Sequence, residues 1–513
     1  MKNILYIALV TFVLMSCSDF LDVKPAGRLI PEAGDVVAYD RLLNNPSTVV
    51  GIFQNNNGTS ALNFLGDDLK ISDIQAEFGW HNGHPNMDCY FAYIFQMPYA
   101  DPNLQDHYWN IGIFRPATIF NIVIEGANKV RTRETDRLAD QVIAQATVAR
   151  AHLYFYGALG YGPVFRPGGD NSRRVLPFRT ADDVMAPMED LSTMQELFDR
   201  ILADIHSIMP DIPEMVPSNT RFGRVQTYAF LAHYHLFTRN FDSVVYYADN
   251  ALTLASMQRG GMRNLFFDMN LFSWSNPQVA TNPDLRAADV IVTPESGEAL
   301  TVSWHRENLL FRSSATAQGN VLSYPSTDFL ALFDANTDLR REFFFFEHDG
   351  FRVVAGNEFH DDGRKVLNFQ DKLNRTSGYT FPEVLLMRAE GLARTGRLPE
   401  ALADLNYLRQ FRHRTGTPEL NILAQNDLIH EIINERRREL PVGSPKRFFD
   451  LKRFVLDEGM PWSVPTITRT LRGRTHTANV DSEYFILPIS NDVLRWNPQW
   501  GIPLESRPWS PNR

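Results

Sequence analysis

Apolar residues recur at spacings of three and four along several long segments of the chain. This is the period of a helix with one buried face, and it predicts helices over residues 109–125, 136–159 and 193–209. The second segment stops at Gly160, as a helix end should. A basic helix is expected over residues 426–440. The pattern therefore predicts a mainly α protein.

A weak internal repeat indicates how some helices pair. Seven positions recur at a constant offset of 157 residues, with a spacing that suits two antiparallel helices joined by a turn. Small residues at Ala389 and Ala401 allow close approach of the helices, and Gly396 permits the turn, as in a tetratricopeptide unit. Chance alignment of two amphipathic hairpins is the alternative, and without a continuous period no solenoid is predicted. The matched positions are Ala232, His235, Arg239, Phe241, Val244, Ala248 and Ala251 in the first copy, and Ala389, Leu392, Gly396, Leu398, Ala401, Leu405 and Leu408 in the second.

The stretch between the two copies loses the helical period. Residues 257–378 are rich in Asn, Ser, Pro and Gly, which predicts long loops with short strands. Insertions of this kind on a helical scaffold commonly carry binding groups. Residues 484–489 are apolar and are expected to form a strand-like plug. The predicted fold class is a tetratricopeptide-like helical hairpin scaffold, mainly α, with long loop-rich insertions and minor β.

The N-terminus has the pattern of an export signal. Lys2 is the only charge before an apolar run over residues 4–15, which is shorter than the about 20 residues of a spanning helix. The tetrad that ends at Cys17 resembles the bacterial lipobox, in which the cysteine becomes the acylated first residue. Residues 1–16 are thus predicted to be a lipoprotein signal peptide, with Cys17 as the lipidation site. An ordinary secretory signal with a chance cysteine is the alternative.

The remaining chain is expected to have three parts. Residues 17–46 contain Pro and Gly and little periodicity, which predicts a tether or leader. Residues 47–260 and 261–513 are predicted to be an N-terminal and a C-terminal part that pack as one compact unit.

Composition limits the function classes. Hydrophobic residues make up 44% of the 513 residues and charged residues 21%, which excludes general disorder. The net charge of −10 argues against nucleic acid as a partner. Only two cysteines occur, so an acylated Cys17 leaves Cys89 without a disulfide partner. Aromatic residues reach 12%, and this excess requires either core packing or a ligand surface.

Several motifs together resemble the SusD/RagB-like family, the starch-utilisation-system D-type nutrient-binding lipoproteins of the outer membrane. The most specific motifs are FPEVLLMRAE at 381–390, ERRREL at 435–440 and FFDLKR at 448–453. One departure is LPVGSP at 440–445, where the family has a continuous acidic and glycine-containing link. The resemblance spans nearly the whole chain. The other matching segments are residues 17–22, 109–124, 149–164, 401–412, 484–488 and 497–498.

The resemblance implies a fold, a function and a partner. It implies a scaffold with four tetratricopeptide-like hairpins, no catalysis and no cofactor. The protein would be lipid-anchored in the outer membrane, facing the exterior, where it would bind oligosaccharide or polysaccharide. It would deliver the ligand to a SusC-like TonB-dependent transporter. A peptide-binding uptake lipoprotein of RagB type is the first alternative, and a surface glycoside hydrolase is the second.

Two stretches of sequence supply the groups that a sugar binder needs. Flat apolar faces suit the ring C–H groups, and planar polar groups suit the hydroxyls. A core position is the alternative for Tyr90 and Tyr93, whereas Trp80, in a loop rich in Gly and Asn, is less easily explained by packing. The predicted ligand-binding residues are Trp80, His81, Asn82, Tyr90 and Tyr93 in the first stretch, and Trp274, Trp304 and Arg306 in the second.

Other chemistry has weaker support in the sequence. His81, His84, Asp88 and Cys89 are metal-ligand types, but their spacing differs from that of structural zinc sites, and no metal is predicted. No GxSxG, GxGxxG or P-loop motif occurs, although two carboxylates alone could serve a glycosidase. The charged run at residues 435–439 is expected to form interlocking ion pairs with a structural role.

Overall fold

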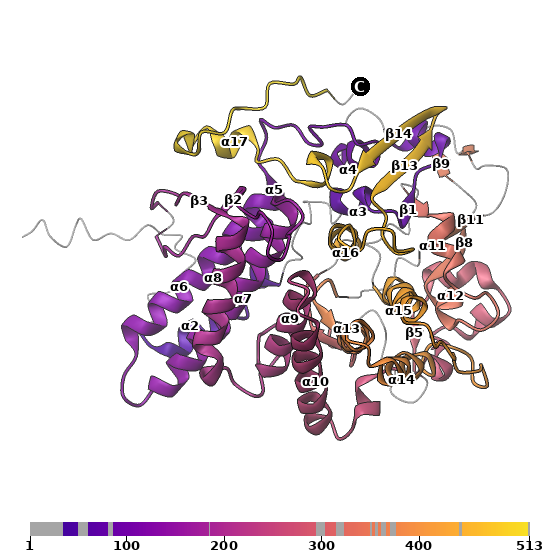
Figure 1. The fold of residues 1–513 in the computed structure, drawn as a ribbon, viewed down its shortest axis with the longest axis horizontal. Coiled ribbons are helices and arrows are strands. Elements are labelled where there is room, and N and C mark those ends of the chain that lie inside the picture. The colour runs from indigo at the N-terminus through magenta and orange to yellow at the C-terminus, as the bar shows by residue number, and fades with distance from the viewer. Residues whose placement is uncertain are drawn as a thin grey trace, which may run out of the picture.

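Long helices occupy the lower part of the computed structural model in Figure 1, and shorter elements from both ends of the chain gather at the top. Within the residues that the structure describes, no helix is both long enough and apolar enough to cross a membrane. The structure describes residues 34–49, 60–80, 86–183, 185–293, 303–313, 323–348, 351–353, 358–360, 366–369, 376–440 and 444–510.

The first group of helices confirms the periodicity analysis. Helices α6 (Arg115–Val130) and α8 (Met194–Ile208) both pack against α7 (Asp136–Tyr161). In α7 every residue from 144 to 161 is buried, so this helix lies at the centre of the group. Helix α8 begins at Thr193 because its hydroxyl accepts the Glu196 N–H at 3.1 Å while the Thr193 N–H donates to the Glu196 carboxylate at 2.7 Å.

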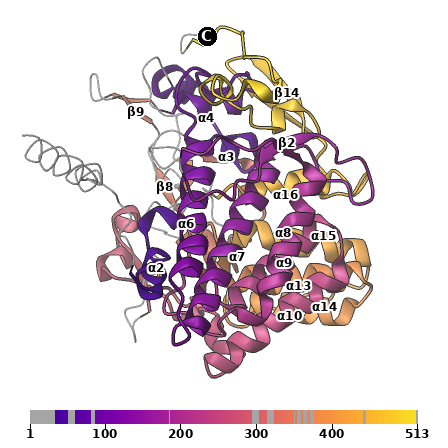
Figure 2. The ribbon, with the colours of Figure 1, turned by 90° about the vertical axis from the view of Figure 1, so that its left-hand side faces the viewer.

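The two copies of the internal repeat form two helical hairpins that stack on each other. Helices α9 (Arg224–Phe237) and α10 (Phe241–Gln258) make the first hairpin, and α13 (Phe381–Arg394) and α14 (Leu398–Arg409) make the second. Helix α10 packs on α13, and Figure 2 shows the four helices side by side.

The equivalent turn positions of the two hairpins have the same backbone conformation. Arg239 has φ 56° and Gly396 has φ 82°, so both turns need a residue in the left-handed region. Ala389 and Ala401 are fully buried between the helices, as the close approach requires. The tetratricopeptide-like prediction is confirmed, and the helix α15 (Gln425–Glu439) adds to the stack by packing on α13.

The stretch between the hairpins is built of short elements, as expected. Its strands form antiparallel two-stranded pairs, β4 with β5, β6 with β12, β8 with β11 and β9 with β10, while β7 pairs with the N-terminal strand β1. The elements are β1 (Leu69–Lys70), β4 (Ser273–Trp274), β5 (Ile291–Val292), β6 (Asn308–Leu310), β7 (Tyr324–Pro325), α11 (Thr327–Ala331), α12 (Leu339–Phe343), β8 (Phe345–His348), β9 (Phe351–Val353), β10 (Glu358–His360), β11 (Val366–Phe369) and β12 (Tyr379–Thr380).

The elements α3 and α4 lie beside the C-terminal strands β13 and β14 at the top of the molecule (Figure 1). A hairpin that the periodicity did not predict, β13 with β14, places Arg469 against the N-terminal elements α3 and α4. The buried Arg469 guanidinium donates to the carbonyls of Phe64 at 2.7 Å and Tyr93 at 2.6 Å, at the C-terminal ends of these two helices. The elements are α3 (Ala61–Leu65), α4 (Met87–Tyr93), α5 (His107–Trp109), β2 (Arg174–Pro177), β3 (Leu191–Thr193), α16 (Lys446–Phe454), β13 (Thr466–Leu471), β14 (Arg474–Asn479) and α17 (Asn491–Leu494).

Two expectations for irregular segments need correction. The expected leader, residues 17–46, is not irregular throughout, because Val36–Leu42 forms helix α2, which packs on α6 and α7. Its Asp40 is ion-paired with the buried Arg221, and this contact holds the segment on the body. Residues 484–489 are not a strand. A single helical turn at Glu483–Phe485 precedes the extended, buried Leu487, whose N–H donates to the Gly160 carbonyl at 2.9 Å.

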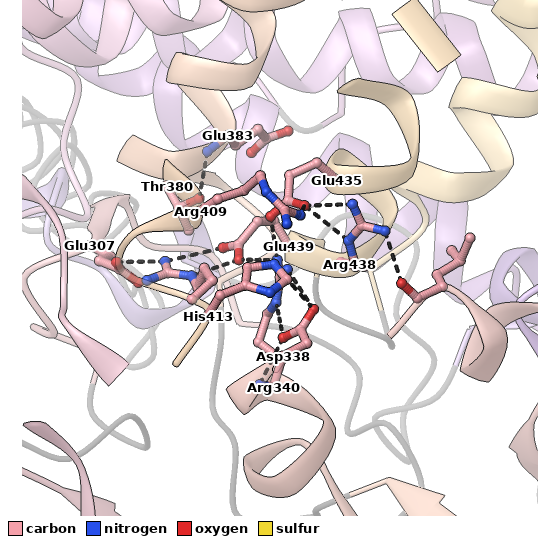
Figure 3. A network of polar contacts seen from close by, with 12 residues as sticks. Glu307, Asp338, Arg340, Thr380, Glu383, Arg409, His413, Glu435, Arg438 and Glu439 are labelled. Carbon is pink, nitrogen blue, oxygen red and sulfur yellow. Dashed lines mark hydrogen bonds and ion pairs between the residues drawn. The ribbon is translucent and has the colours of Figure 1, made fainter. Parts of the chain in front are cut away.

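A network of buried charges joins α15 to the insertion (Figure 3). The Glu439 carboxylate accepts hydrogen bonds at 2.7 Å from both Arg340 and Arg412. Arg340 is also ion-paired with Asp338 at 2.8 Å, and Arg412 with Glu307 at 2.7 Å. The side chains of all five residues are at most 3% exposed, so each charge depends on its partners for the solvation it has lost.

A second set of buried charges holds α13, α15 and α16 together. The Arg453 guanidinium donates to Glu390 at 2.7 Å and to Asp450 at 2.6 Å, and these carboxyl groups have pKa values lowered to about 2 even though burial alone would raise them. Arg436 of α15 reaches the same Asp450 at 2.8 Å. The charged run at residues 435–439 therefore has the structural role that the sequence predicted.

We expect Arg438→Ala to destabilise the fold. Its guanidinium, 6% exposed, donates to Glu435 at 2.9 Å and to the Leu332 carbonyl at 2.9 Å, and truncation would leave both without this donor. The free energy of unfolding should fall by about 3 kcal/mol in chemical denaturation. The control is Arg397→Ala, which removes a solvent-exposed ion pair with Glu400 and should change stability little. Equal effects of the two substitutions would contradict the structural role of the network.

Candidate functional site

Trp80 lies in the core, contrary to the expectation of a surface loop. It follows the π-helical turn Gln75–Gly79 and is 3% exposed. Its ring packs edge-on against Phe64, with centroids 5.6 Å apart, and is stacked with Tyr90 at 6.2 Å. The Gly- and Asn-rich composition around Trp80 therefore indicated an irregular backbone, but it did not indicate exposure of the tryptophan.

The two tyrosines of the first stretch differ in exposure. Tyr93 is 4% exposed, and the Arg469 guanidinium lies 4.3 Å from its ring centroid, so the alternative of a core position describes this residue. Tyr90 is partly exposed beside Trp80, and burial of its hydroxyl raises its pKa. His81 and Asn82, like Cys17, lie outside the described residues.

The second stretch places one tryptophan at the surface. Trp304 is 67% exposed, and two residues later the Arg306 guanidinium lies 5.5 Å from the ring centroid of the buried Phe267. The Arg306 carbonyl accepts a hydrogen bond from Arg259 at 2.5 Å, which fixes the backbone here. An accessible indole, with a guanidinium two residues away in the sequence, supplies the types of group that suit a sugar ring.

Trp274 lies earlier in the insertion and packs among other side chains. It is the last residue of β4 and is partly buried, with the Phe343 ring at 5.8 Å and the Arg286 guanidinium at 5.9 Å from its ring centroid. The described members of the predicted set therefore differ in exposure: Trp80 and Tyr93 are buried, Tyr90, Trp274 and Arg306 are partly buried, and Trp304 is exposed.

The structure also contains a pocket that the sequence did not suggest. It has a volume of about 250 Å³ and lies between α4, the segment 98–108 that leads into α5, and the C-terminal segment from Leu487 to Trp509. Tyr99 and Trp509 illustrate why it was missed: the Trp509 ring N–H donates to the Tyr99 carbonyl at 3.4 Å across 410 residues of sequence. No local motif could reveal walls that are so far apart in the chain.

Two carboxyl groups of the pocket are held by tyrosine hydroxyls. Asp106 precedes α5, where it accepts the Trp109 N–H at 3.0 Å and the Tyr161 hydroxyl at 3.2 Å. Burial raises the pKa of Asp106 to about 6, although these hydrogen bonds oppose the shift. Asp88 accepts the Tyr108 hydroxyl at 2.7 Å, and burial raises its pKa as well. Both acids are therefore easier to protonate than a carboxyl group in water.

Comparison with known proteins identifies similar sequences and folds. The model of the SusD family matches residues 371–499, and a model described as starch-binding associating with outer membrane matches residues 19–236. A search of curated proteins finds no significant match.

Solved structures resemble the chain over almost its whole length. A SusD superfamily protein from Bacteroides vulgatus has a TM-score of 0.64 at 16% identity, with 91% of this chain and 98% of that chain covered. A SusD-like carbohydrate binding protein from the same species gives 0.60 at 16% identity, covering 91% and 97%. A SusD superfamily protein from Bacteroides thetaiotaomicron gives 0.62 at 16% identity, covering 90% and 98%. At these identities the similarity establishes the fold.

We expect alanine substitution to separate the core tryptophan from the surface tryptophan. Trp80→Ala removes a buried indole and should lower the free energy of unfolding by about 3–5 kcal/mol. Trp304→Ala removes an exposed side chain and should leave the denaturation midpoint within error of the parent protein. A stable Trp80→Ala variant would contradict the core packing seen here.

Proposed function

Because this chain belongs to the SusD/RagB-like family, we propose that it is a cell-surface outer-membrane lipoprotein that binds oligosaccharide or polysaccharide and delivers it to a SusC-like TonB-dependent transporter. The observation that carries the proposal is the pair of family models, which match both ends of one helical scaffold. The described insertion lies on that scaffold between the two matched regions and supplies the exposed aromatic surface. In this proposal the protein binds its ligand without turnover and needs no cofactor.

The platform at Trp304 and Arg306 is the proposed contact with the glycan. In the free protein the Trp304 side chain is 67% exposed, and contact of its apolar ring with water is unfavourable. A sugar ring that covers the indole would remove this contact. The Arg306 guanidinium offers several N–H donors to sugar hydroxyls in a fixed plane. Contact with the Phe267 ring holds the guanidinium in position. The buried Glu307, the next residue in the sequence, holds the backbone.

The proposed anchor is an acyl group on Cys17. The sequence before it has the length and charge of a signal peptide, and the model that matches from residue 19 carries a description of outer-membrane association. Two or more acyl chains would hold the body at a bilayer durably, since each buried methylene contributes about 0.8 kcal/mol.

We expect Trp304→Ala to weaken glycan binding. Calorimetric titration of the protein with a panel of oligosaccharides and peptides should identify a saturable sugar ligand, and chromatography should detect no products. Loss of the indole should weaken that affinity about tenfold, which corresponds to about 1.4 kcal/mol.

The control for this substitution is another exposed tryptophan. Trp496 is 83% exposed on the C-terminal segment, and Trp496→Ala should leave the affinity unchanged. Unchanged affinity in Trp304→Ala would rule out the platform. Saturable binding of peptides alone would favour the RagB-type alternative, and sugar cleavage would favour the hydrolase.

We expect Cys17→Ser to release the protein from the membrane. The parent protein should incorporate labelled palmitate and partition into the detergent phase, because acylation requires the thiol of the lipobox cysteine. The variant should take up no label and remain in the aqueous phase. Cys89→Ala is the matched control and should keep the label, because Cys89 is buried in α4. Labelling of Cys17→Ser would disprove the proposed anchor.

A further inference from the structure

We propose that the pocket between α4, α5 and the C-terminal segment binds a small organic ammonium ion of the size of an amino sugar. This site is separate from the glycan platform at Trp304 and does not depend on the proposed function. Its volume of about 250 Å³ lies just below the roughly 300–1,000 Å³ of sites for drug-sized ligands, so a single ring or short chain is the appropriate occupant.

The charge of the lining favours a cation. Asp88, Asp101, Asp106 and Glu505 line the pocket, and His107 is the one basic side chain among the described residues that do so. Glu505 is paired with Arg507 at 2.5 Å, which leaves the three aspartates as the groups available to an ammonium ion. An anion would meet these carboxylates at close range and would be repelled, whereas an ammonium group can donate to their oxygens.

Aromatic rings supply the second feature of a site for an organic cation. Tyr99, Tyr108, Tyr161 and Trp509 contribute to the walls, and ring faces attract cations through their quadrupoles. These rings are held in place before any ligand arrives. The Tyr99 hydroxyl donates to the Tyr484 carbonyl at 2.7 Å, and Trp509 packs edge-on against Phe91 with centroids 5.9 Å apart. A preformed wall lowers the entropy cost of binding.

A buried hydroxyl in the lining provides an independent sign of a ligand. Ser490 is 9% exposed, and its Oγ has no hydrogen-bond partner among the described residues. It stands at the start of α17, yet its side chain makes no capping hydrogen bond to that helix. A buried polar group without a partner costs about 1–3 kcal/mol, so a ligand that bonds with this hydroxyl would recover part of that cost.

The ionisation of Asp106 should couple ligand binding to pH. The groups that bond with its carboxyl are the hydroxyl of Tyr161 and the backbone N–H groups of Tyr108, Trp109 and Ser490. His107, which follows it in the sequence, and the Asp88–Tyr108 pair line the same pocket. At pH 5 the Asp106 carboxyl is protonated in most of the molecules, because its pKa is raised to about 6. An ammonium ion binds the ionised form, so affinity should rise as the pH rises through this range.

The test compares glucosamine with glucose in calorimetric titrations of the mature protein. The two sugars have the same ring and differ by an ammonium group in place of one hydroxyl. We expect one glucosamine per protein, at least tenfold tighter than glucose, and an affinity that rises about eightfold from pH 5 to pH 6.5, where the ammonium group stays charged. Equal affinity for the two sugars, or no binding of either, would overturn the proposal.

Substitutions test whether glucosamine binds in this pocket. Asp101→Asn and Ser490→Ala should each weaken glucosamine binding at least threefold while thermal unfolding confirms that both variants fold. Asp242→Asn, an exposed aspartate on α10, is the matched control and should have no effect. Trp304→Ala should also leave glucosamine binding unchanged, so failure of the glycan platform and failure of this pocket can be told apart. Unchanged binding in both pocket variants would move the site elsewhere and refute the assignment.

Discussion

The arrangement of the insertion depends on the hydrogen bonds that the Glu439 carboxylate accepts. It lies at the end of α15 in the helical stack and bonds with two arginines from outside that helix, Arg340 and Arg412. Arg412 also donates hydrogen bonds to Glu307 and, at 2.8 Å, to the Phe267 carbonyl. Glu307 in turn accepts the Phe267 N–H at 2.8 Å. The exposed platform at Trp304 therefore stands three residues from a fully buried ionic network, which fixes its position relative to the scaffold.

Buried cations that donate to backbone carbonyl groups connect the C-terminal segment to the N-terminal part of the chain. The Lys452 ammonium group donates to the carbonyls of Leu159 and Gly162, at 2.7 and 2.6 Å, and to that of Phe485 at 3.2 Å. The end of α7 is thereby attached to the C-terminal segment. Burial lowers the pKa of Lys452 to about 7, so its ammonium group loses a proton near neutral pH. Arg469 makes the equivalent connection to α3 and α4. Part of the wall of the acidic pocket, at Ala61, Tyr161 and Leu487, comes from the segments that these two cations join.

The scaffold was predictable because its signals are local. Periodicity located α7 and α8 within about two residues and α6 within about six, and the shared offset of Arg239 and Gly396 marked two turns that have the same backbone conformation. The ligand-binding set was less predictable, because exposure depends on tertiary packing. Trp80 and Trp304 both occur beside polar residues in sequence, yet one is 3% and the other 67% exposed. The pocket had no local signal at all, since its walls come from residues near 61, 88, 100, 161 and 487–509.

The contrast between the two kinds of contact explains why this chain uses so many buried charges. Helices in the stack are positioned mainly by long apolar faces, to which the ion pairs among α13, α15 and α16 are added. The described part of the insertion has short strands and brief helices, so buried side chains such as Phe329 and Phe345 pack without a long regular face that would define their register. Paired guanidinium–carboxylate bonds have fixed directions and lose several kcal/mol when one partner moves away. A loop-rich insertion held in this way can carry an exposed aromatic platform in a defined place without a sheet or long helix of its own.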